Sequence, residues 1–237
     1  MPLTRSERSR RRWTRLLVIA GFAVAVVAAG SAFLIYGGRS GPAEQKPVIL
    51  YVNQGNGVVN GSGFGAMLGF ASDHGFNTVF FQVYRGGRLL FSPVTLGSFV
   101  NQTHAAGLKI FLALYITNAS QTIPESLYGL REDGVSLDMS ALPLSAQQSR
   151  LSTLKSEFRG ETAVTTTDMT SPLRPDLLVL ETYGAGYQQY IKTGIVGSVG
   201  VFATSSQADY QSQFQYALQN SDGVMVFDYY GLQKAGY

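Results

Sequence analysis

Val48-Ile-Leu-Tyr-Val52 begins the stretch that decides the fold, because a short and almost continuous apolar run is typical of a strand buried on both faces. Thr78-Val-Phe-Phe-Gln-Val-Tyr84 is a second run of this kind. Between these strands, apolar residues recur at the spacing of one helix face: Phe64, Met67, Leu68 and Ala71. A strand, a helix and a second strand in this order predict a parallel β-α-β unit.

The same alternation continues along the chain. A helix is predicted from Ser92-Pro93, where a capping residue precedes proline at the first helical position. Further helices are predicted at 145–158 and around Tyr210, Phe214, Ala217 and Leu218. Residues 135–138 form either a short strand or a flap. The other strands are predicted at 109–115, 161–168, 177–181, 199–204 and 224–229.

Eight alternating strands form either an open, doubly wound sheet or a closed barrel. Residues 47–237 are fewer than the roughly 250 residues that a (β/α)8 barrel usually needs. We nevertheless favour a small (β/α)8-type TIM barrel, because its closure would bring together acidic residues that lie far apart in the sequence.

These acidic residues lie at the carboxyl ends of predicted strands, where parallel α/β folds place their active sites. Glu181 and Asp228 each share a strand face with apolar residues two and four positions earlier, and Asp168 shares a face with Val164 and Thr166. In a barrel these faces can point inward, and the three carboxylates then meet at one mouth. The alternative for each acid is a local role as a helix cap or a solvated loop residue.

Convergent carboxylates surrounded by tyrosines predict glycoside hydrolysis, which uses one carboxylic acid to protonate the leaving oxygen and a second carboxylate at the anomeric carbon. We assign Glu181 as acid/base and Asp168 as nucleophile or stabiliser, with Asp228 in reserve. The residues expected to contact the sugar lie at the same strand ends: Gln82, Tyr84, Arg85, Tyr115 and Tyr229. For Arg85, pairing with an acid is the structural alternative.

Other chemistries lack their residues. The chain has no cysteine and only two histidines, His74 and His104, both expected near helix ends, so we predict neither a metal nor a cofactor. Gly61-Ser-Gly63-Phe-Gly-Ala66 matches a dinucleotide-binding pattern, but it begins eight residues beyond Asn53 rather than in a tight turn. We interpret these glycines as a mobile loop at the barrel mouth.

The N-terminal segment predicts a membrane anchor. Residues 1–15 carry six arginines and one glutamate, whereas 16–36 form an uncharged apolar run of 21 residues, about the length that spans a bilayer. We therefore expect a cytoplasmic tail at 1–15, a transmembrane helix at 16–36, a linker at 37–46 and an extracytoplasmic domain at 47–237. A signal peptide cleaved near 28–31 is the alternative.

Charge bears on the partners. The whole chain has a net charge of +3, and residues 1–15 alone carry +5. The rest of the chain therefore carries about −2, which does not favour nucleic-acid binding. The expected partners are therefore the membrane, through residues 16–36, and a carbohydrate.

Several segments resemble glycoside hydrolases with TIM barrels, the family-10-like group and its relatives. Gly75-Phe-Asn-Thr-Val-Phe-Phe-Gln-Val-Tyr-Arg85 is similar to their second strand, and Leu90-Phe-Ser-Pro93 to the loop after it. The helix-to-strand segment 104–114, the segment 133–139 and the late strand 222–229 also resemble these proteins. The resemblance covers about a quarter of the chain and implies a barrel acting on a carbohydrate.

Within this resemblance, Asp168 corresponds to the aspartate that ends the fourth strand. The family usually shows Asp-Gly-Ile-x-Phe-Asp-Tyr there, whereas this chain has Ala163-Val-Thr-Thr-Thr-Asp168. If 135–138 is instead the fourth strand, Asp138 and Glu181 become the pair on strands four and six. A barrel that binds glycans without cleaving them is the alternative function.

Overall fold

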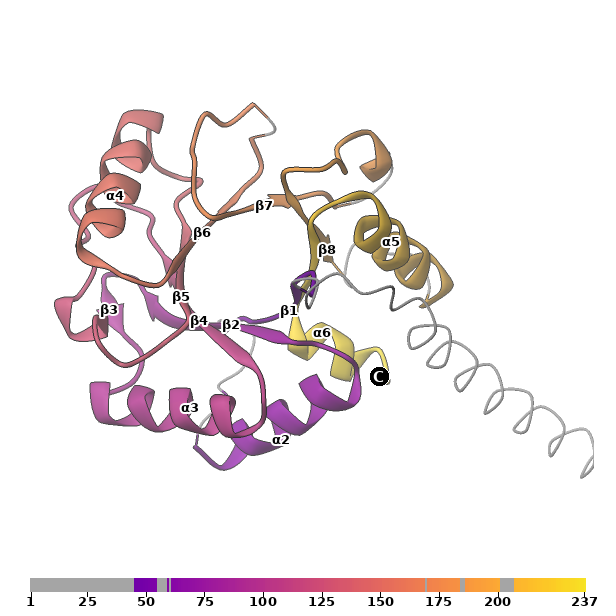
Figure 1. Cartoon of the computed structure of the whole chain (residues 1–237), viewed down its shortest axis with the longest axis horizontal. Coiled ribbons are helices and arrows are strands. Elements are labelled where there is room, and N and C mark those ends of the chain that lie inside the picture. The colour runs from indigo at the N-terminus through magenta and orange to yellow at the C-terminus, as the bar shows by residue number, and fades with distance from the viewer. Residues whose placement is uncertain (1–44, 55–58, 60, 169, 184–185, 201–206) are drawn as a thin grey trace, which may run out of the picture. The chain divides into compact units, whose positions relative to one another are not determined.

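The strands of this protein close into a barrel. The computed structural model describes residues 45–54, 59, 61–168, 170–183, 186–200 and 207–237. Within these residues eight parallel strands pair in the order β1-β9-β8-β7-β6-β5-β4-β2, and β1 also pairs with β2. Figure 1 shows this ring of strands end-on, with helices around it. The closed barrel is confirmed, and the open sheet is excluded.

Most of the strands lie where the apolar runs predict them. The parallel strands are β1 (Val48–Val52), β2 (Thr78–Arg85), β4 (Lys109–Tyr115), β5 (Gly134–Asp138), β6 (Glu161–Thr166), β7 (Leu177–Glu181), β8 (Val196–Gly200) and β9 (Gly223–Phe227). The short β3 (Arg88–Leu89) forms an antiparallel hairpin with β2. The segment that was either a strand or a flap is therefore the strand β5.

Three predicted strand limits are corrected. β6 ends at Thr166, so Asp168 lies beyond the strand. β9 ends at Phe227, because Asp228 begins the turn into a helix. β8 begins at Val196, three residues before the predicted start, and the predicted end at 201–204 lies outside the described residues.

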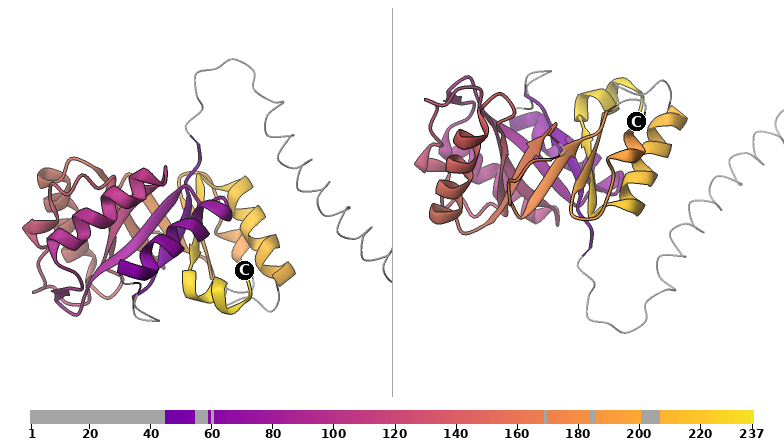
Figure 2. Two further views of the ribbon diagram at one scale, coloured as in Figure 1. Left: turned by 90° about the horizontal axis from the view of Figure 1, so that it is seen from below. Right: turned by 90° about the horizontal axis from the view of Figure 1, so that it is seen from above.

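Helices cover the outside of the ring of strands, as the side views of Figure 2 show. They are α2 (Gly61–Asp73), α3 (Pro93–Ala105), α4 (Leu144–Glu157), α5 (Gln207–Asn220) and α6 (Tyr229–Lys234). Ser92 caps α3 as predicted, accepting a hydrogen bond from the backbone N–H of Thr95. The glycines interpreted as a mobile loop instead form the first turns of α2, which corrects that prediction.

The small size of the barrel follows from its connections. In the described part of the chain, the links from β4 to β5, β6 to β7 and β7 to β8 contain no α-helix. The first has only the 3-10 turn η1 (Glu125–Leu127), and the third has η2 (Tyr187–Gln189). A full set of helices would require more residues, so their absence lets about 190 residues complete a barrel.

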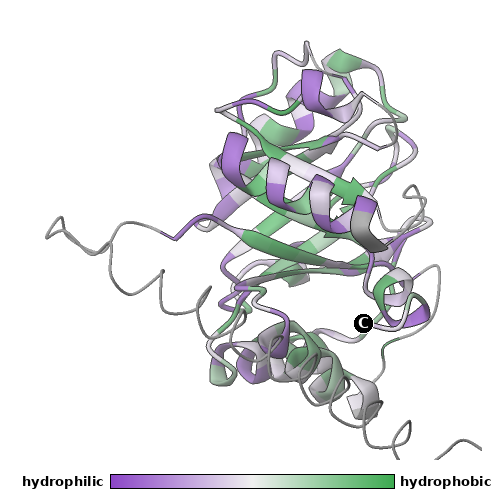
Figure 3. Cartoon of the chain, turned by 90° about the vertical axis from the view of Figure 1, so that its right-hand side faces the viewer, coloured by the Kyte–Doolittle hydropathy of each residue, from purple (hydrophilic) through white to green (hydrophobic). Residues whose placement is uncertain are grey.

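The side chains of each strand alternate between two apolar clusters. Leu50, Val135 and Val164 belong to the larger cluster, which also contains helix residues. The smaller cluster contains strand residues alone and fills the barrel interior: Ile49, Tyr51, Phe80, Phe111, Ala113, Ala163, Val179, Val196 and Met225. Figure 3 shows how strongly apolar the strands are between the more polar helices. This alternation decides which strand-end residues reach the mouth.

Among the described residues, no helix is long and apolar enough to cross a membrane. The predicted transmembrane segment, 16–36, lies outside the described residues.

Candidate active site

Two carboxylates end the inward faces of β5 and β7, two strands that flank β6, at the mouth of the barrel. Asp138 is the last residue of β5, the fourth barrel strand, and Glu181 is the last residue of β7, the sixth. Val179 lies in the interior cluster, so Glu181, two residues later, faces the same side. Val135 and Leu137 lie in the outer cluster, which leaves Ser136 and Asp138 facing inward. Both acids are partly exposed.

The two acids influence each other electrostatically. Burial raises the pKa of Glu181, and the nearby charge of Asp138 raises it further, against a hydrogen bond with Tyr183. Burial also raises the pKa of Asp138, but Ser140 opposes this by donating from its hydroxyl (3.1 Å) and backbone N–H (3.5 Å). The bonds from Ser140 thus favour the charged form of Asp138, whereas the charge of Asp138 favours the protonated form of Glu181. Such a division is what an acid and a carboxylate partner require.

Aromatic side chains form the wall of the mouth around these acids. The rings of Tyr51 and Phe227 lie 5.0 Å apart, and those of Tyr183 and Phe227 lie 6.3 Å apart, both between centroids. The Tyr183 hydroxyl lies 3.2 Å from the Ser198 hydroxyl. Burial, followed by the neighbouring carboxylates, raises the pKa of both Tyr51 and Tyr183. Both phenols therefore stay protonated and can donate hydrogen bonds.

Three of the predicted sugar contacts lie at this mouth. Gln82 is buried and hydrogen-bonds to Tyr51. The guanidinium of Arg85 lies over the ring of Tyr115, 5.8 Å from its centroid. Its charge also lowers the pKa of Tyr51, which places Arg85 close to the mouth. Among the described residues Arg85 contacts an aromatic ring and forms no ion pair with an acid, which was the structural alternative.

The other two predicted contacts lie outside the barrel. Tyr84 belongs to the outer cluster, because an irregularity between Gln82 and Tyr84 changes the alternation of β2. Tyr229 is the first residue of α6 and packs edge-on against Phe70, with ring centroids 5.2 Å apart. Its hydroxyl accepts a hydrogen bond from Gln233 at 2.7 Å.

The structure does not bring Asp168 and Asp228 together with Glu181 in the predicted way. The predicted face of β6 is the outer one, since Val164 lies in the outer cluster and Ala163 in the interior. Asp168 is exposed, and its Oδ1 accepts hydrogen bonds from the backbone N–H (2.9 Å) and hydroxyl (2.8 Å) of Thr170. These bonds lower the pKa of Asp168.

Asp228 is the N-cap of α6 and accepts a hydrogen bond from the backbone N–H of Gly231 at 2.9 Å. The local capping role, which was the alternative for each acid, is therefore observed for this residue. Asp138 takes the place at the mouth that was predicted for Asp168.

Sequence reasoning missed four residues of the mouth: Tyr51, Tyr183, Ser198 and Phe227. Tyr51 and Phe227 could have been found from the two-residue period of β1 and β9, which puts them on the faces of Ile49 and Met225. Tyr183 follows β7 outside any regular pattern, so no sequence signal identifies it. Among the described residues, no three His, Asp or Glu side chains group in a way that could hold a metal ion.

No protein-family model matches the chain, and no curated protein sequence matches it. Solved structures do match. A GH113 β-1,4-mannanase superposes with a TM-score of 0.55 and 9% identity, over 78% of this chain and 88% of its own. A noncanonic maltogenic α-amylase from Thermotoga neapolitana superposes with a TM-score of 0.51 and 13% identity, over 79% of this chain and 69% of its own. A xylanase and α-amylase inhibitor protein from Scadoxus multiflorus superposes with a TM-score of 0.51 and 10% identity, over 80% of this chain and 95% of its own.

The shared feature is the barrel. The chain has a TIM-barrel fold, which it shares with the mannanase and the amylase. The similarity extends over most of the domain, which supports the broad resemblance seen in the sequence but not family 10 in particular. At these identities it concerns the fold alone, and the inhibitor protein has the same fold as the two enzymes.

Proposed function

We propose that the barrel domain hydrolyses O-glycosidic bonds in a polysaccharide or other glycan. The observation that supports this most is the pair Asp138 and Glu181, which end the fourth and sixth strands and influence each other's ionisation. Aromatic rings beside a carboxylate pair suit a sugar, because they offer apolar area to its C–H faces while polar groups bond its hydroxyls.

In the proposed reaction, Glu181 is the general acid. It protonates the glycosidic oxygen as the bond to the anomeric carbon breaks. The ionised Asp138 either attacks that carbon, forming a glycosyl-enzyme that water then hydrolyses, or takes a proton from the water that attacks it. In the first route Glu181, left as a carboxylate, regains its proton from the water that hydrolyses the glycosyl-enzyme. In the second route Asp138 releases to solvent the proton that it took from water, and Glu181 takes up a proton from solvent, which restores both groups. Gln82, Arg85 and Tyr115 hold the sugar hydroxyls, and Tyr51 and Tyr183 donate to its oxygens.

The test compares the full-length chain with Glu181→Gln, Asp138→Asn and Asp168→Asn on soluble starch, β-1,4-mannan and xylan, with released reducing sugar as the readout. We expect losses of about 10²- to 10⁴-fold in kcat for the first two variants, the usual contribution of acid–base groups. Asp168→Asn, which removes an exposed carboxylate bonded to Thr170, should keep full activity. A large loss with Asp168→Asn alone would overturn the assignment of Asp138.

A glycan-binding barrel without turnover is the second candidate; the occurrence of the same fold in a protein described as an enzyme inhibitor favours a barrel without catalysis, and the aromatic mouth favours a glycan as its ligand. Measuring glycan binding alongside hydrolysis separates the two. Equal binding by wild type and Glu181→Gln, with no sugar released by either, would establish the binding function.

We also propose that residues 16–36 anchor the chain in a membrane with the barrel on the non-cytoplasmic side, on the strength of their length and the arginines before them. Protease treatment of intact cells should digest the barrel domain. Recovery of the full chain in the soluble fraction would contradict the anchor.

A further inference from the structure

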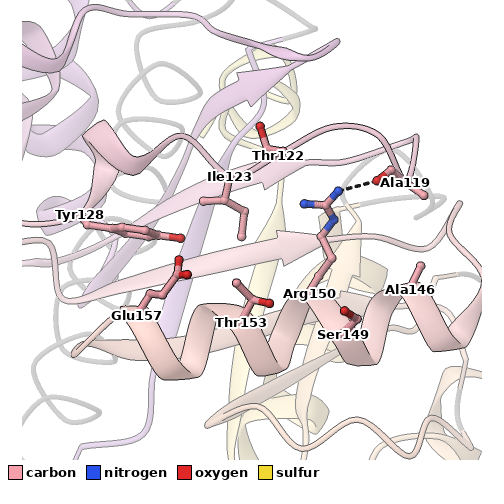
Figure 4. Close-up of a pocket in the computed structure, with 9 residues that line it drawn as sticks. All are labelled: Ala119, Thr122, Ile123, Tyr128, Ala146, Ser149, Arg150, Thr153 and Glu157. Atoms are coloured by element: carbon pink, nitrogen blue, oxygen red, sulfur yellow. Dashed lines mark hydrogen bonds between the residues drawn. The ribbon is translucent and has the colours of Figure 1, made fainter.

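A second hollow lies on the outside of the barrel, away from the acids. It has a volume of about 260 Å³ and lies between α4 and the loop that links β4 to β5. This is one of the links in which the described residues contain no α-helix. Figure 4 shows the hollow, with α4 as its floor and residues 119–128 above. We call it the α4 groove.

The floor of the groove is a single face of α4. The five α4 residues that line it recur at helical spacing: Ala146, Ser149, Arg150, Thr153 and Glu157. Leu151 and Leu154 lie on another face and are buried in the outer cluster. The floor therefore consists of one alanine and four polar or charged side chains.

The two charged groups of the groove are already engaged within the protein. Arg150 donates from Nη2 to the carbonyl oxygen of Ala119 at 2.6 Å. Tyr128 hydrogen-bonds to Glu157 and, mainly through burial and then through this carboxylate, its pKa rises to about 12. A guanidinium and a carboxylate held in this way keep free donors and acceptors for polar groups. They are less suited to neutralise a ligand of high net charge.

The lining of the groove as a whole combines apolar area with hydroxyl groups. Ile123, Tyr128 and Ala146 pack against the outer cluster while staying partly exposed, so their positions are fixed. Thr122, Ser149 and Thr153 are exposed along the same groove. A fixed apolar wall with hydroxyls, one donor group and one acceptor group matches an uncharged ring that has an apolar face and many hydroxyls.

We propose that the α4 groove is an accessory binding site for a neutral oligosaccharide, distinct from the mouth that contains Asp138 and Glu181. Its volume is slightly below the roughly 300 Å³ at which pockets for drug-sized ligands begin, which suits one or two sugar rings. The choice of a sugar among polyhydroxylated ligands rests on the proposed function. The loop above the groove begins after Tyr115, the last residue of β4.

The test uses Thr153→Tyr, which places a ring in the groove from an exposed helix position, and Ser152→Tyr as the matched control outside it. Binding of the full-length chain to soluble starch, β-1,4-mannan and xylan is measured by affinity electrophoresis, and glycylglycine serves as a zwitterionic probe. We expect Thr153→Tyr to weaken retention by at least one glycan about tenfold, the loss of roughly 1.4 kcal/mol of contacts. Ser152→Tyr should behave as wild type.

Hydrolysis of a short soluble oligosaccharide separates this site from the mouth. Thr153→Tyr should leave this hydrolysis unchanged, whereas Glu181→Gln should lower it by about 10²- to 10⁴-fold, as given above, and keep polysaccharide retention. Loss of retention in Thr153→Tyr with no hydrolysis by any variant would support the groove and refute the enzyme. Three outcomes would overturn the proposed oligosaccharide site. Thr153→Tyr could be retained as strongly as wild type, or none of the three glycans could retain the wild-type chain. The wild-type chain could also bind glycylglycine, but not Thr153→Tyr, while no glycan distinguishes the two.

Discussion

At the scale of the residue, the division of labour between Asp138 and Glu181 depends on one small neighbour. Ser140 donates from its hydroxyl to Asp138 at 3.1 Å, and this bond opposes the rise in the pKa of Asp138 that burial causes. A hydrogen bond to a carboxylate favours its charged form. The exposed Ser140 thus favours the charged form of Asp138, whereas burial and the charge of Asp138 raise the pKa of Glu181.

Ser140→Ala should therefore raise the pKa of Asp138. Because an active enzyme needs Asp138 ionised, the acid limb of the pH–rate profile should move to higher pH, with little change on the alkaline limb. Ser140→Thr keeps the hydroxyl and is the matched control. An acid limb that stays in place in Ser140→Ala would show that Asp138 does not set it.

Glu132 presents a different residue-scale case, a buried carboxyl far from any proposed chemistry. Its side chain is 7% exposed, and burial raises its pKa from an ordinary 4.5 to about 7. Since the folded pKa is the higher one, the folded state holds a proton that the unfolded chain has lost between these values. Stability from this group is complete below about pH 4.5 and declines as pH rises to about 7.

Glu132→Gln replaces the ionisable carboxyl group with an amide of nearly the same shape. We expect the variant to gain on the order of 2 kcal/mol in unfolding free energy at pH 8 and almost nothing at pH 4.5. Urea unfolding at the two pH values provides the measurement. An equal effect at both would mean that packing, and not ionisation, governs this position.

At the scale of the element, one acid that was a catalytic candidate stabilises a helix. Asp228 caps α6, which has only six residues and therefore relies strongly on its first turn. Asp228→Ala should lower the unfolding free energy by about 1 kcal/mol, as the loss of a cap usually does. Asp228→Asn, which still accepts the bond from Gly231, should lose much less.

Activity per folded molecule separates the cap from a catalytic role. It should be the same for Asp228→Ala, Asp228→Asn and wild type on the substrates named above. A fall of a hundredfold or more in Asp228→Asn, at unchanged stability, would restore Asp228 as a catalytic candidate.

The elements also show what the sequence can predict. β1, β4 and β7 occur with the predicted limits, because each is an apolar run with clear ends. A two-residue period shows which residues share a face, but not which face points into the barrel. This information was lacking for β6, where Ala163 and not Val164 faces inward. Glu181 was placed correctly because Val179 is indeed an interior residue.

At the scale of the whole molecule, the mouth depends on a barrel interior that is packed below it. Phe80 and Phe111 stack there with centroids 4.7 Å apart, and Phe111 is 1% exposed. The space that these rings need is provided on the adjacent strand by Gly134, the first residue of β5 and the register partner of Phe111: a Cβ at that position would lie 2.2 Å from Cε1 of Phe111. β5, which ends in Asp138 at the mouth, therefore packs closely against β4 at its other end, where Gly134 lies beside Phe111.

Gly134→Ala should therefore destabilise the domain by about 1–3 kcal/mol, the usual cost of overpacking a closely filled interior. Gly69→Ala is the matched control: Gly69 is exposed within α2, a Cβ there meets nothing within 4 Å, and alanine favours the helix by about 0.5–1 kcal/mol. Urea unfolding should show the two variants moving in opposite directions. If Gly134→Ala instead left stability unchanged, Phe111 would have room to move, and the strands that carry Tyr115 and Asp138 would lack the rigid support that a pair of positioned carboxylates requires.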